Sequence, residues 1–390
     1  MNEGLDHFIA PAIMVIQSCV QELVMKKFLI VGLALLFFGS VLHAEDARLM
    51  PFRVGRTTLS TSFSFGDKQF DSDGKRVDAP AIKLFNLGGL MEFGALHWLT
   101  AAVYWAPGYY LWSDLDIVLG TAGSSVNLFD TGDLMLGAKL QILGSTGLIN
   151  NESFRLSLSP GLKIPLPGPN YEKQLSNMQA GDPVTVANMD YHVFGLALGT
   201  YFDFVINQYF SINLYNQVIY YPQKKSMKEA GLEEYGDALL SDIINSALNG
   251  YHLPNLISYG GVSYGYDLSF EVEPAFNTVI ANGILLYAGL PIMYKTSSGK
   301  KIDMSYNAGH IALAGVIAAD PLNKALIDKI DKLERKQSHL LTLKPAASVF
   351  FYGWKLPFEF RLSYFIPLWG QNITSAAQTF SFQAKVYFKI

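Results

Sequence analysis

The chain has 390 residues, of which 50% are hydrophobic and only 16% charged, and its formal net charge at pH 7 is −4. Together with a mean hydropathy of +0.21, this composition favours a membrane protein over a soluble enzyme. The slight acidic balance provides no basic surface, so we expect no nucleic-acid partner. Only helices and closed β-barrels satisfy their backbone hydrogen bonds in lipid, so the periodicity of the sequence must decide between them.

Taken in chain order, the first predicted element is an export signal at residues 25–44. Lys26 and Lys27 precede an apolar run over 28–38, and Ala44 ends a cleavage site of small residues. A buried helix and an N-terminal anchor are the alternative interpretations. The run is short and turns polar at once, which favours a cleaved signal peptide.

Residues 1–24 have no role in front of an export signal, so we interpret them as an upstream start-site artefact. The mature chain is then 45–390. Cys19, the only cysteine, falls in the upstream part. A mature chain without cysteine has neither thiol catalysis nor Cys-ligated zinc.

The mature chain alternates with period two. In 153–166, 192–206, 208–221 and 376–390, apolar residues occupy one parity and polar or small residues the other. A helix, at 100° per residue, would scatter these residues around its circumference, whereas a membrane-spanning strand turns one parity to lipid and the other to the lumen. The sequence therefore predicts an all-β, antiparallel, up-and-down transmembrane barrel.

Twelve strands are predicted, and a further hairpin hidden in 277–312 would make fourteen. Their ranges are 53–66, 81–94, 98–110, 131–143, 152–166, 190–206, 208–222, 257–273, 277–296, 339–353, 356–368 and 376–390. Short connections, among them 274–276, alternate with long polar ones, which is the layout of periplasmic turns and external loops. An even strand number leaves both termini on the periplasmic side.

Two long loops contain apolar residues at helical spacing, at 226–249 and from Pro321 to about 339. These helices could form a lid on the barrel rim or a funnel for substrate. The nearly uncharged runs 94–112 and 276–294 are long enough for membrane helices. Both contain Pro and Gly, and a helical membrane protein would need several more such runs.

The sequence contains no catalytic constellation: no Gly-x-Ser-x-Gly elbow, no HExxH and no phosphate loop. Asp71-Ser72-Asp73-Gly74 begins like a calcium loop but lacks the later Glu. We therefore expect no enzyme activity, no cofactor and no metal site.

Alternation instead predicts a charged lumen, because Arg or Lys facing lipid at mid-membrane costs roughly 2–4 kcal/mol. The charged residues assigned inward are Asp133, Lys139, Arg155, Lys163, Asp203, Asp267, Glu271, Glu359, Arg361 and Lys385. Tyr215, Tyr259, Phe365 and Tyr387 share this parity. These charges could form a paired, rigid network or a binding path. On the second interpretation the candidate ligand contacts are Arg155, Lys163, Tyr215, Tyr259, Phe365 and Arg361.

Two stretches resemble a known family. Met91-Glu92-Phe93-Gly94-Ala95-Leu96-His97-Trp98-Leu99-Thr100 is similar to a strand–turn–strand element of FadL/TodX-type outer-membrane transporters of long-chain fatty acids and hydrophobic compounds. The segment 132–139, followed by 156–165, is similar to a later pair of strands there. The resemblance implies a monomeric barrel of fourteen strands with an N-terminal hatch in its lumen. Here only residues 45–52 precede the first strand, so either the hatch is missing or a loop such as 167–189 folds inward.

The leading hypothesis is an outer-membrane uptake channel for hydrophobic nutrients, long-chain fatty acids above all. A general diffusion porin and a surface-exposed adhesin or structural barrel are the alternatives. The partners expected are outer-membrane lipid, hydrophobic small molecules and the barrel-assembly machinery, with the chain a monomer.

Overall fold

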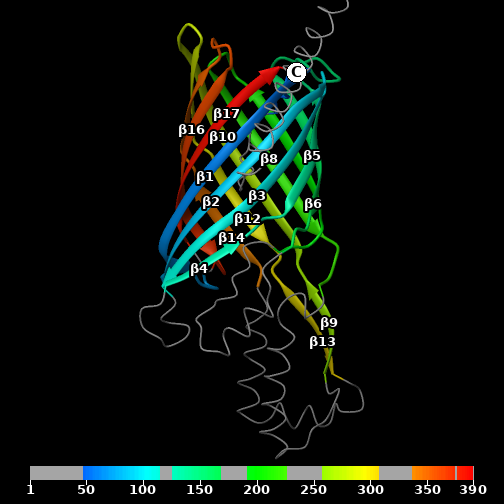
Figure 1. The fold of residues 1–390 in the computed structure, drawn as a ribbon, viewed down its shortest axis with the longest axis vertical. Helices are drawn as coiled ribbons and strands as arrows, with labels where there is room; N and C mark the ends of the chain where they lie inside the picture. The colour runs from blue at the N-terminus through cyan, green and yellow to red at the C-terminus, as the bar shows by residue number, and fades with distance from the viewer. Residues whose placement is uncertain are drawn as a thin grey trace, which may run out of the picture.

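The structure is a computed structural model, which describes residues 47–114, 125–167, 191–225, 257–306, 336–373 and 376–389 (Figure 1). The predicted signal peptide and upstream segment lie outside these residues. So do the loop 168–190, the predicted helix at 226–249 and all but the last residues of the one predicted at 321–339.

Seventeen β-strands occur in the described residues. They are β1 (Val54–Phe70), β2 (Arg76–Leu96), β3 (Leu99–Asp114), β4 (Ser125–Asp130), β5 (Leu134–Leu143), β6 (Phe154–Ile164), β7 (Gly195–Val205), β8 (Phe210–Tyr221), β9 (Ile257–Ser263), β10 (Gly265–Ala281), β11 (Ile284–Gly289), β12 (Ile292–Ser297), β13 (Lys301–Tyr306), β14 (Ser338–Leu343), β15 (Ala346–Phe351), β16 (Phe358–Gln371) and β17 (Gln378–Lys389). Among these residues no helix is long and apolar enough to span a membrane.

The sheet closes on itself. The strands of the large sheet pair antiparallel in a continuous ring, and β17 pairs with β16 on one side and β1 on the other. The closing pair runs in continuous register from Val54 opposite Lys389 to Phe65 opposite Gln378. Closure leaves no sheet edge with unpaired backbone groups in lipid, which is the requirement for a strand-built membrane protein.

The closed wall has twelve strands, because three of them are interrupted and named in two parts. β4 and β5 both pair with β3, β11 and β12 both pair with β10, and β14 and β15 both pair with β16. Two of the interruptions contain a proline, Pro291 and Pro345, which has no N–H for the ladder. The predicted antiparallel barrel is confirmed, with twelve strands.

The stretch 277–312, which was expected to hide a further hairpin, instead contains β13. β9 pairs with β13 in a separate two-stranded sheet, beyond the pair β10–β12 (Figure 1). The predicted strand 257–273 therefore combines β9 with the first half of β10. Neither β9 nor β13 is part of the closed wall.

The short turn predicted at 274–276 is wrong. Those residues lie inside β10, and the turn is at Asn282-Gly283, where Gly283 has φ +81°. Pro274 interrupts only one N–H of the ladder, and its carbonyl still accepts a hydrogen bond from the N–H of Leu290. The Asn-Gly pair, which suits a tight hairpin with positive φ, was the sequence signal for the correct position.

The two faces of the wall have opposite chemistry. Along β1, the inward side chains Arg56, Thr58, Ser60, Ser62 and Ser64 are all buried. The outward Phe63 and Phe65, by contrast, are each 39% exposed. The same contrast recurs around the barrel, with outward Leu198, Phe270, Leu362 and Phe380 exposed. An exposed apolar belt on a closed barrel is stable only in lipid, so the chain is an outer-membrane β-barrel.

An aromatic cluster lies near the short-turn end of the barrel. Trp354 contacts Phe351 and Phe358, whose neighbour Phe360 stacks on Phe382. Aromatic rings at this level suit the boundary between hydrocarbon and head groups. At the opposite end the β9–β13 pair extends beyond the barrel wall, as expected for the external side (Figure 1).

Candidate functional site

The lumen is the candidate site, because alternation directs the charged side chains into it. Acidic and basic side chains from different strands form ion pairs there. Arg56 binds Glu92 across β1 and β2, Lys385 Nζ lies 3.4 Å from the Glu359 carboxylate, and Arg361 Nη2 lies 3.2 Å from that of Glu273.

Glu273 is the centre of a polar cluster on this wall. It accepts hydrogen bonds from Asn213 Nδ2 at 3.1 Å and from the Tyr287 hydroxyl. The guanidinium of Arg361 lies 4.8 Å from the centroid of the Tyr287 ring. Next along β10, Glu271 lies 3.5 Å from Lys344 Nζ. Such compensation is what allows several charges to be buried side by side.

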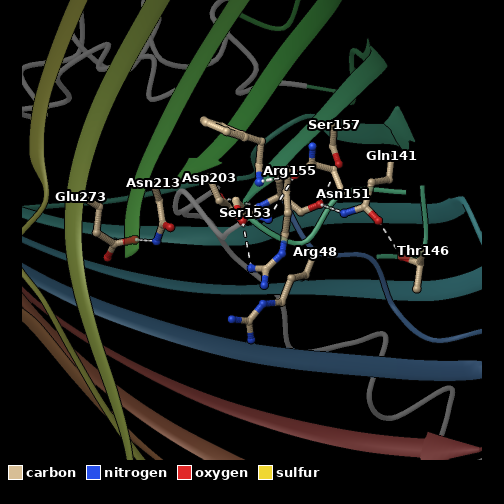
Figure 2. Close-up of polar contacts among 12 residues, drawn as sticks. Arg48, Gln141, Thr146, Asn151, Ser153, Arg155, Ser157, Asp203, Asn213 and Glu273 are labelled. Atoms are coloured by element: carbon tan, nitrogen blue, oxygen red, sulfur yellow. Dashed lines mark hydrogen bonds and ion pairs between the residues drawn. The ribbon is translucent and has the colours of Figure 1, made fainter. Parts of the chain in front are cut away.

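A second group of charges lies on β5, β6 and β7. Asp133 lies 3.2 Å from Lys163 Nζ and 3.0 Å from His192 Nδ1. Arg155 Nη1 lies 3.5 Å from Asp203 (Figure 2). His192 adopts φ +48°, and with its neighbour Val193 is buried, so the chain entering β7 reaches into the lumen.

Residues 47–53, which we call the N-terminal strap, lie inside the barrel near the short-turn end. The Ala47 N–H lies 2.9 Å from each carboxylate oxygen of Asp203. The Ala47 carbonyl accepts hydrogen bonds from Gln141 Nε2 at 2.9 Å and from Ser157 Oγ at 2.6 Å. Figure 2 shows these three side chains, Gln141, Ser157 and Asp203, converging from β5, β6 and β7.

The strap continues along the wall to β1. The N–H of Met50 donates to Thr100 Oγ1 at 2.9 Å, and the N–H of Arg53 to the Gly94 carbonyl at 2.9 Å. Gly94 permits this approach, because a Cβ there would lie 2.1 Å from the Pro51 carbonyl oxygen. The short segment before the first strand is therefore long enough to enter the lumen.

The two sides of the lumen differ. On β2, β3, β5, β6 and β7 lies a cavity of about 70 Å³. Most of its lining is apolar or small, including Leu90, Ala102, Tyr104, Met135, Gly137, Gly161, Ala197 and Tyr201, and the charged Glu92 and Lys139 also line it. A cavity of about 220 Å³ lies against the opposite wall, and its charged lining is Arg48, Arg56, Glu273, Glu359, Arg361 and Lys385. The first cavity is thus richer in apolar residues than the second, and charged side chains line both.

A third cavity, of about 350 Å³, lies toward the external side between β8, β10, β12 and β14. Lys295 is exposed to it, beside the apolar Ile219 and Leu340. Glu271 and Asp267 act on this ammonium electrostatically, but among the described residues none forms an ion pair with it. The ammonium group of Lys295 could therefore bind an anionic group of a ligand that enters this cavity.

Five of the six predicted ligand contacts are in the wall of the lumen. Arg155, Lys163 and Arg361 form the ion pairs above, Tyr215 packs on Tyr201 with ring centroids 4.8 Å apart, and Phe365 lies 5.3 Å from Lys344 Nζ. Their role in binding stays a prediction. Tyr259 is misplaced: it lies in β9, opposite Met304 of β13, off the barrel wall.

Six charged lumen residues among those described were not predicted from the sequence: Arg48, Arg56, Glu92, Glu273, Lys295 and Lys344. Glu273 was not assigned to the lumen because the predicted strand ended there, at the turn wrongly placed at 274–276. Lys344 falls at the interruption between β14 and β15, where alternation is broken. For Arg56 and Lys295 the signal was present, since each lies between apolar or hydroxyl residues of a period-two segment.

No protein-family model matches the chain, and no curated protein matches its sequence. Among solved structures, an outer-membrane channel from Pseudomonas putida F1 is similar, with a TM-score of 0.54 and 12% identity over 89% of this chain and 100% of that one. The β domain of a Bordetella autotransporter (TM-score 0.41, 8% identity, 86% and 100% covered) and a Pseudomonas aeruginosa FadL homologue (TM-score 0.30, 8% identity, 86% and 90% covered) are more distant. The fold is therefore that of outer-membrane β-barrel proteins.

Proposed function

We propose that this chain is an uptake channel for small hydrophobic nutrients that carry an acidic group, long-chain fatty acids being the first candidates. The observation that carries the proposal is the pair of lumen cavities, one on β2–β7 with a mostly apolar and small lining and one on the opposite wall that contains Arg48, Arg56, Arg361 and Lys385. A molecule with a hydrocarbon body and a carboxylate would find apolar contacts in the first and cationic side chains in the second.

The Lys295 cavity is the entry site in this proposal. It lies toward the external side. Its lining combines the Lys295 cation with apolar residues and with Asp267, whose carboxylate accepts a hydrogen bond from the Tyr221 hydroxyl. A carboxylate that reached it would gain a charge-assisted hydrogen bond, while its hydrocarbon would contact Ile219 and Leu340. Of the contacts predicted from sequence, Lys163 lies at the external end of β6 beside Tyr221, and Arg155 lies near the short-turn end. In this proposal a ligand would therefore meet Lys163 near the entry and Arg155 further in.

The test is a fluorescence-quenching titration of the refolded barrel in detergent with decanoate and with decanol, which share a chain but differ in charge. Lys295→Gln should weaken decanoate binding about tenfold, because a hydrogen bond to a charged group contributes roughly 1.5–3 kcal/mol, and should leave decanol unchanged. Lys355→Gln, at an exposed position at the short-turn end, is the matched control. An unrelated barrel corrects for uptake by micelles.

A general diffusion porin is the second candidate, favoured by the many charged lumen side chains. It predicts a large, steady conductance in planar bilayers and no saturable binding of decanoate. Saturable binding with a small conductance supports uptake of hydrophobic nutrients. A large conductance without saturable binding supports the porin.

A further inference from the structure

The Lys295 cavity contains one charged residue of each sign. Among the residues that line it, only Lys295 and Asp267 are charged. They lie on the paired strands β12 and β10, where Asp267 is opposite Ser297 and Lys295 is opposite Ser269. The two charged residues are therefore diagonal neighbours on one face of the sheet, with backbones about 7–8 Å apart. The cavity thus presents a cation and an anion side by side.

These two charges do not form an ion pair with each other, although their strands are adjacent. The Tyr221 hydroxyl donates a hydrogen bond to Asp267 Oδ2 at 2.7 Å. Strand β10 lies between β8, which contains Tyr221, and β12, which contains Lys295. The hydrogen bond therefore holds the carboxylate toward β8, on the side away from the Lys295 ammonium.

The next acid on this face of β10 has a cation of its own. Glu271 acts on Lys295 electrostatically, but its carboxylate lies 3.5 Å from Lys344 Nζ. Glu271 is also absent from the lining of the cavity, which extends from β8 to β14 and toward the external side. Asp267 is therefore the acid that a ligand in this cavity would meet together with Lys295.

Each of the two charged residues has an apolar neighbour in the same cavity. Ile219 of β8 is opposite Asp267, and Leu340 of β14 is opposite Lys295. At about 350 Å³ the cavity is within the size range of small-molecule sites. A ligand with both charges at one end could place its hydrocarbon against Ile219 or Leu340.

We propose that this cavity selects amphipathic zwitterions, molecules whose hydrocarbon body ends in an adjoining ammonium and carboxylate, as in a long-chain α-amino acid. The proposal rests on the proposed function and narrows its substrate class. The carboxylate of the ligand accepts a hydrogen bond from Lys295, and its ammonium donates one to Asp267. Both hydrogen bonds are charge-assisted.

A simple acid matches only half of this site. Its carboxylate would pair with Lys295 but would be repelled by the nearby carboxylate of Asp267, because like charges disfavour each other at short range. An ammonium next to the carboxylate removes this repulsion and adds the second hydrogen bond. The pair of charges therefore favours the zwitterion over the acid with the same hydrocarbon chain.

The experiment compares decanoate with 2-aminodecanoate, which has the same chain and carries an ammonium beside its carboxylate. Both are titrated against the barrel refolded in detergent, with fluorescence quenching as the signal and an unrelated barrel as the correction for micelles. The wild-type chain should bind 2-aminodecanoate about tenfold more tightly, since a hydrogen bond to a charged group contributes roughly 1.5–3 kcal/mol.

Three variants identify the residues responsible. Asp267→Asn keeps an oxygen for the Tyr221 hydroxyl but loses the charge, so it should bind the two ligands equally. Lys295→Gln should weaken the binding of both. Glu152→Gln removes an exposed carboxylate at the short-turn end and should behave as the wild type.

Equal binding of the two ligands by the wild type would overturn the preference for zwitterions while leaving the uptake of hydrophobic acids intact. An undiminished preference in Asp267→Asn would overturn it as well. If neither ligand showed saturable binding, the proposed function would fail together with this inference. Heat-dependent migration on gels, measured for each variant, verifies that the barrel has formed.

Discussion

At the scale of single residues, the buried ion pairs determine which substitutions the lumen tolerates. Arg361 and Glu273 are 6% and 2% exposed, and the acid is held by Asn213 and Tyr287 as well. Removing one member of such a pair leaves the other charged and enclosed, whereas removing both charges costs much less. Single and double variants at this pair should therefore differ strongly.

Arg361→Ala should lower the free energy of unfolding by about 3 kcal/mol, because Glu273 would remain in the wall without its cation. Arg361→Met combined with Glu273→Gln should recover most of that loss. Urea titrations of the refolded variants in lipid vesicles measure both. If the double variant were as unstable as the single one, packing of the guanidinium rather than charge compensation would be its contribution.

At the scale of elements, the N-terminal strap occupies part of the lumen and lines one of its cavities. Its docking depends on backbone groups, which Asp203, Gln141, Ser157 and Thr100 hold in place, and on the absence of a side chain at Gly94. Since the strap forms one side of the charged cavity, its displacement should widen the path.

Gly94→Ala should displace the strap, since the new Cβ would overlap the Pro51 carbonyl oxygen. Overpacking of this kind costs about 1–3 kcal/mol, enough to raise the undocked population about tenfold. Single-channel recordings should then show larger or more frequent openings. Gly137→Ala is the control, because its Cβ would lie 3.4 Å from the nearest atom. Identical recordings from the two variants would refute a narrowing role for the strap.

At the scale of the whole molecule, the barrel wall separates a lipid-facing exterior from a charged interior. Two successive residues of one strand face these two opposite environments. Leu198 of β7 is opposite Val218 of β8 and 48% exposed, whereas Gln217, the preceding residue of β8, lines two of the cavities. The same new charge should therefore have opposite consequences at these two positions.

Leu198→Arg should destabilise the inserted barrel by roughly 2–4 kcal/mol, the cost of a cation facing lipid near the midplane. Gln217→Arg should change stability much less and alter ion selectivity instead. Folding titrations in vesicles, together with reversal potentials in a salt gradient, distinguish the two effects. Similar losses of stability in both would contradict the assignment of faces.

The pattern of residues along the chain was enough to predict the class of the protein and the direction of most of the side chains assigned to the lumen. Period-two alternation is local, so it can be followed along β1, β6, β8 or β17 without knowing the neighbours of each strand. It correctly placed Arg155, Lys163, Tyr215, Phe365 and Arg361 in the lumen. It failed at Pro274, where a proline inside β10 suggested a turn although alternation continues through it, and between β14 and β15, where alternation is broken.

Only the tertiary structure decided the number of strands, the pairing of the charges and the position of the strap. Arg361 meets Glu273 across 88 residues of sequence because closure of the barrel brings β16 and β10 to the same lumen. The register across each pair of strands sets the level at which a side chain lies, and no single strand encodes it. The strap is held by hydrogen bonds from its backbone, which every sequence can offer, so its place depends on the acceptors and donors that the closed barrel gathers around it.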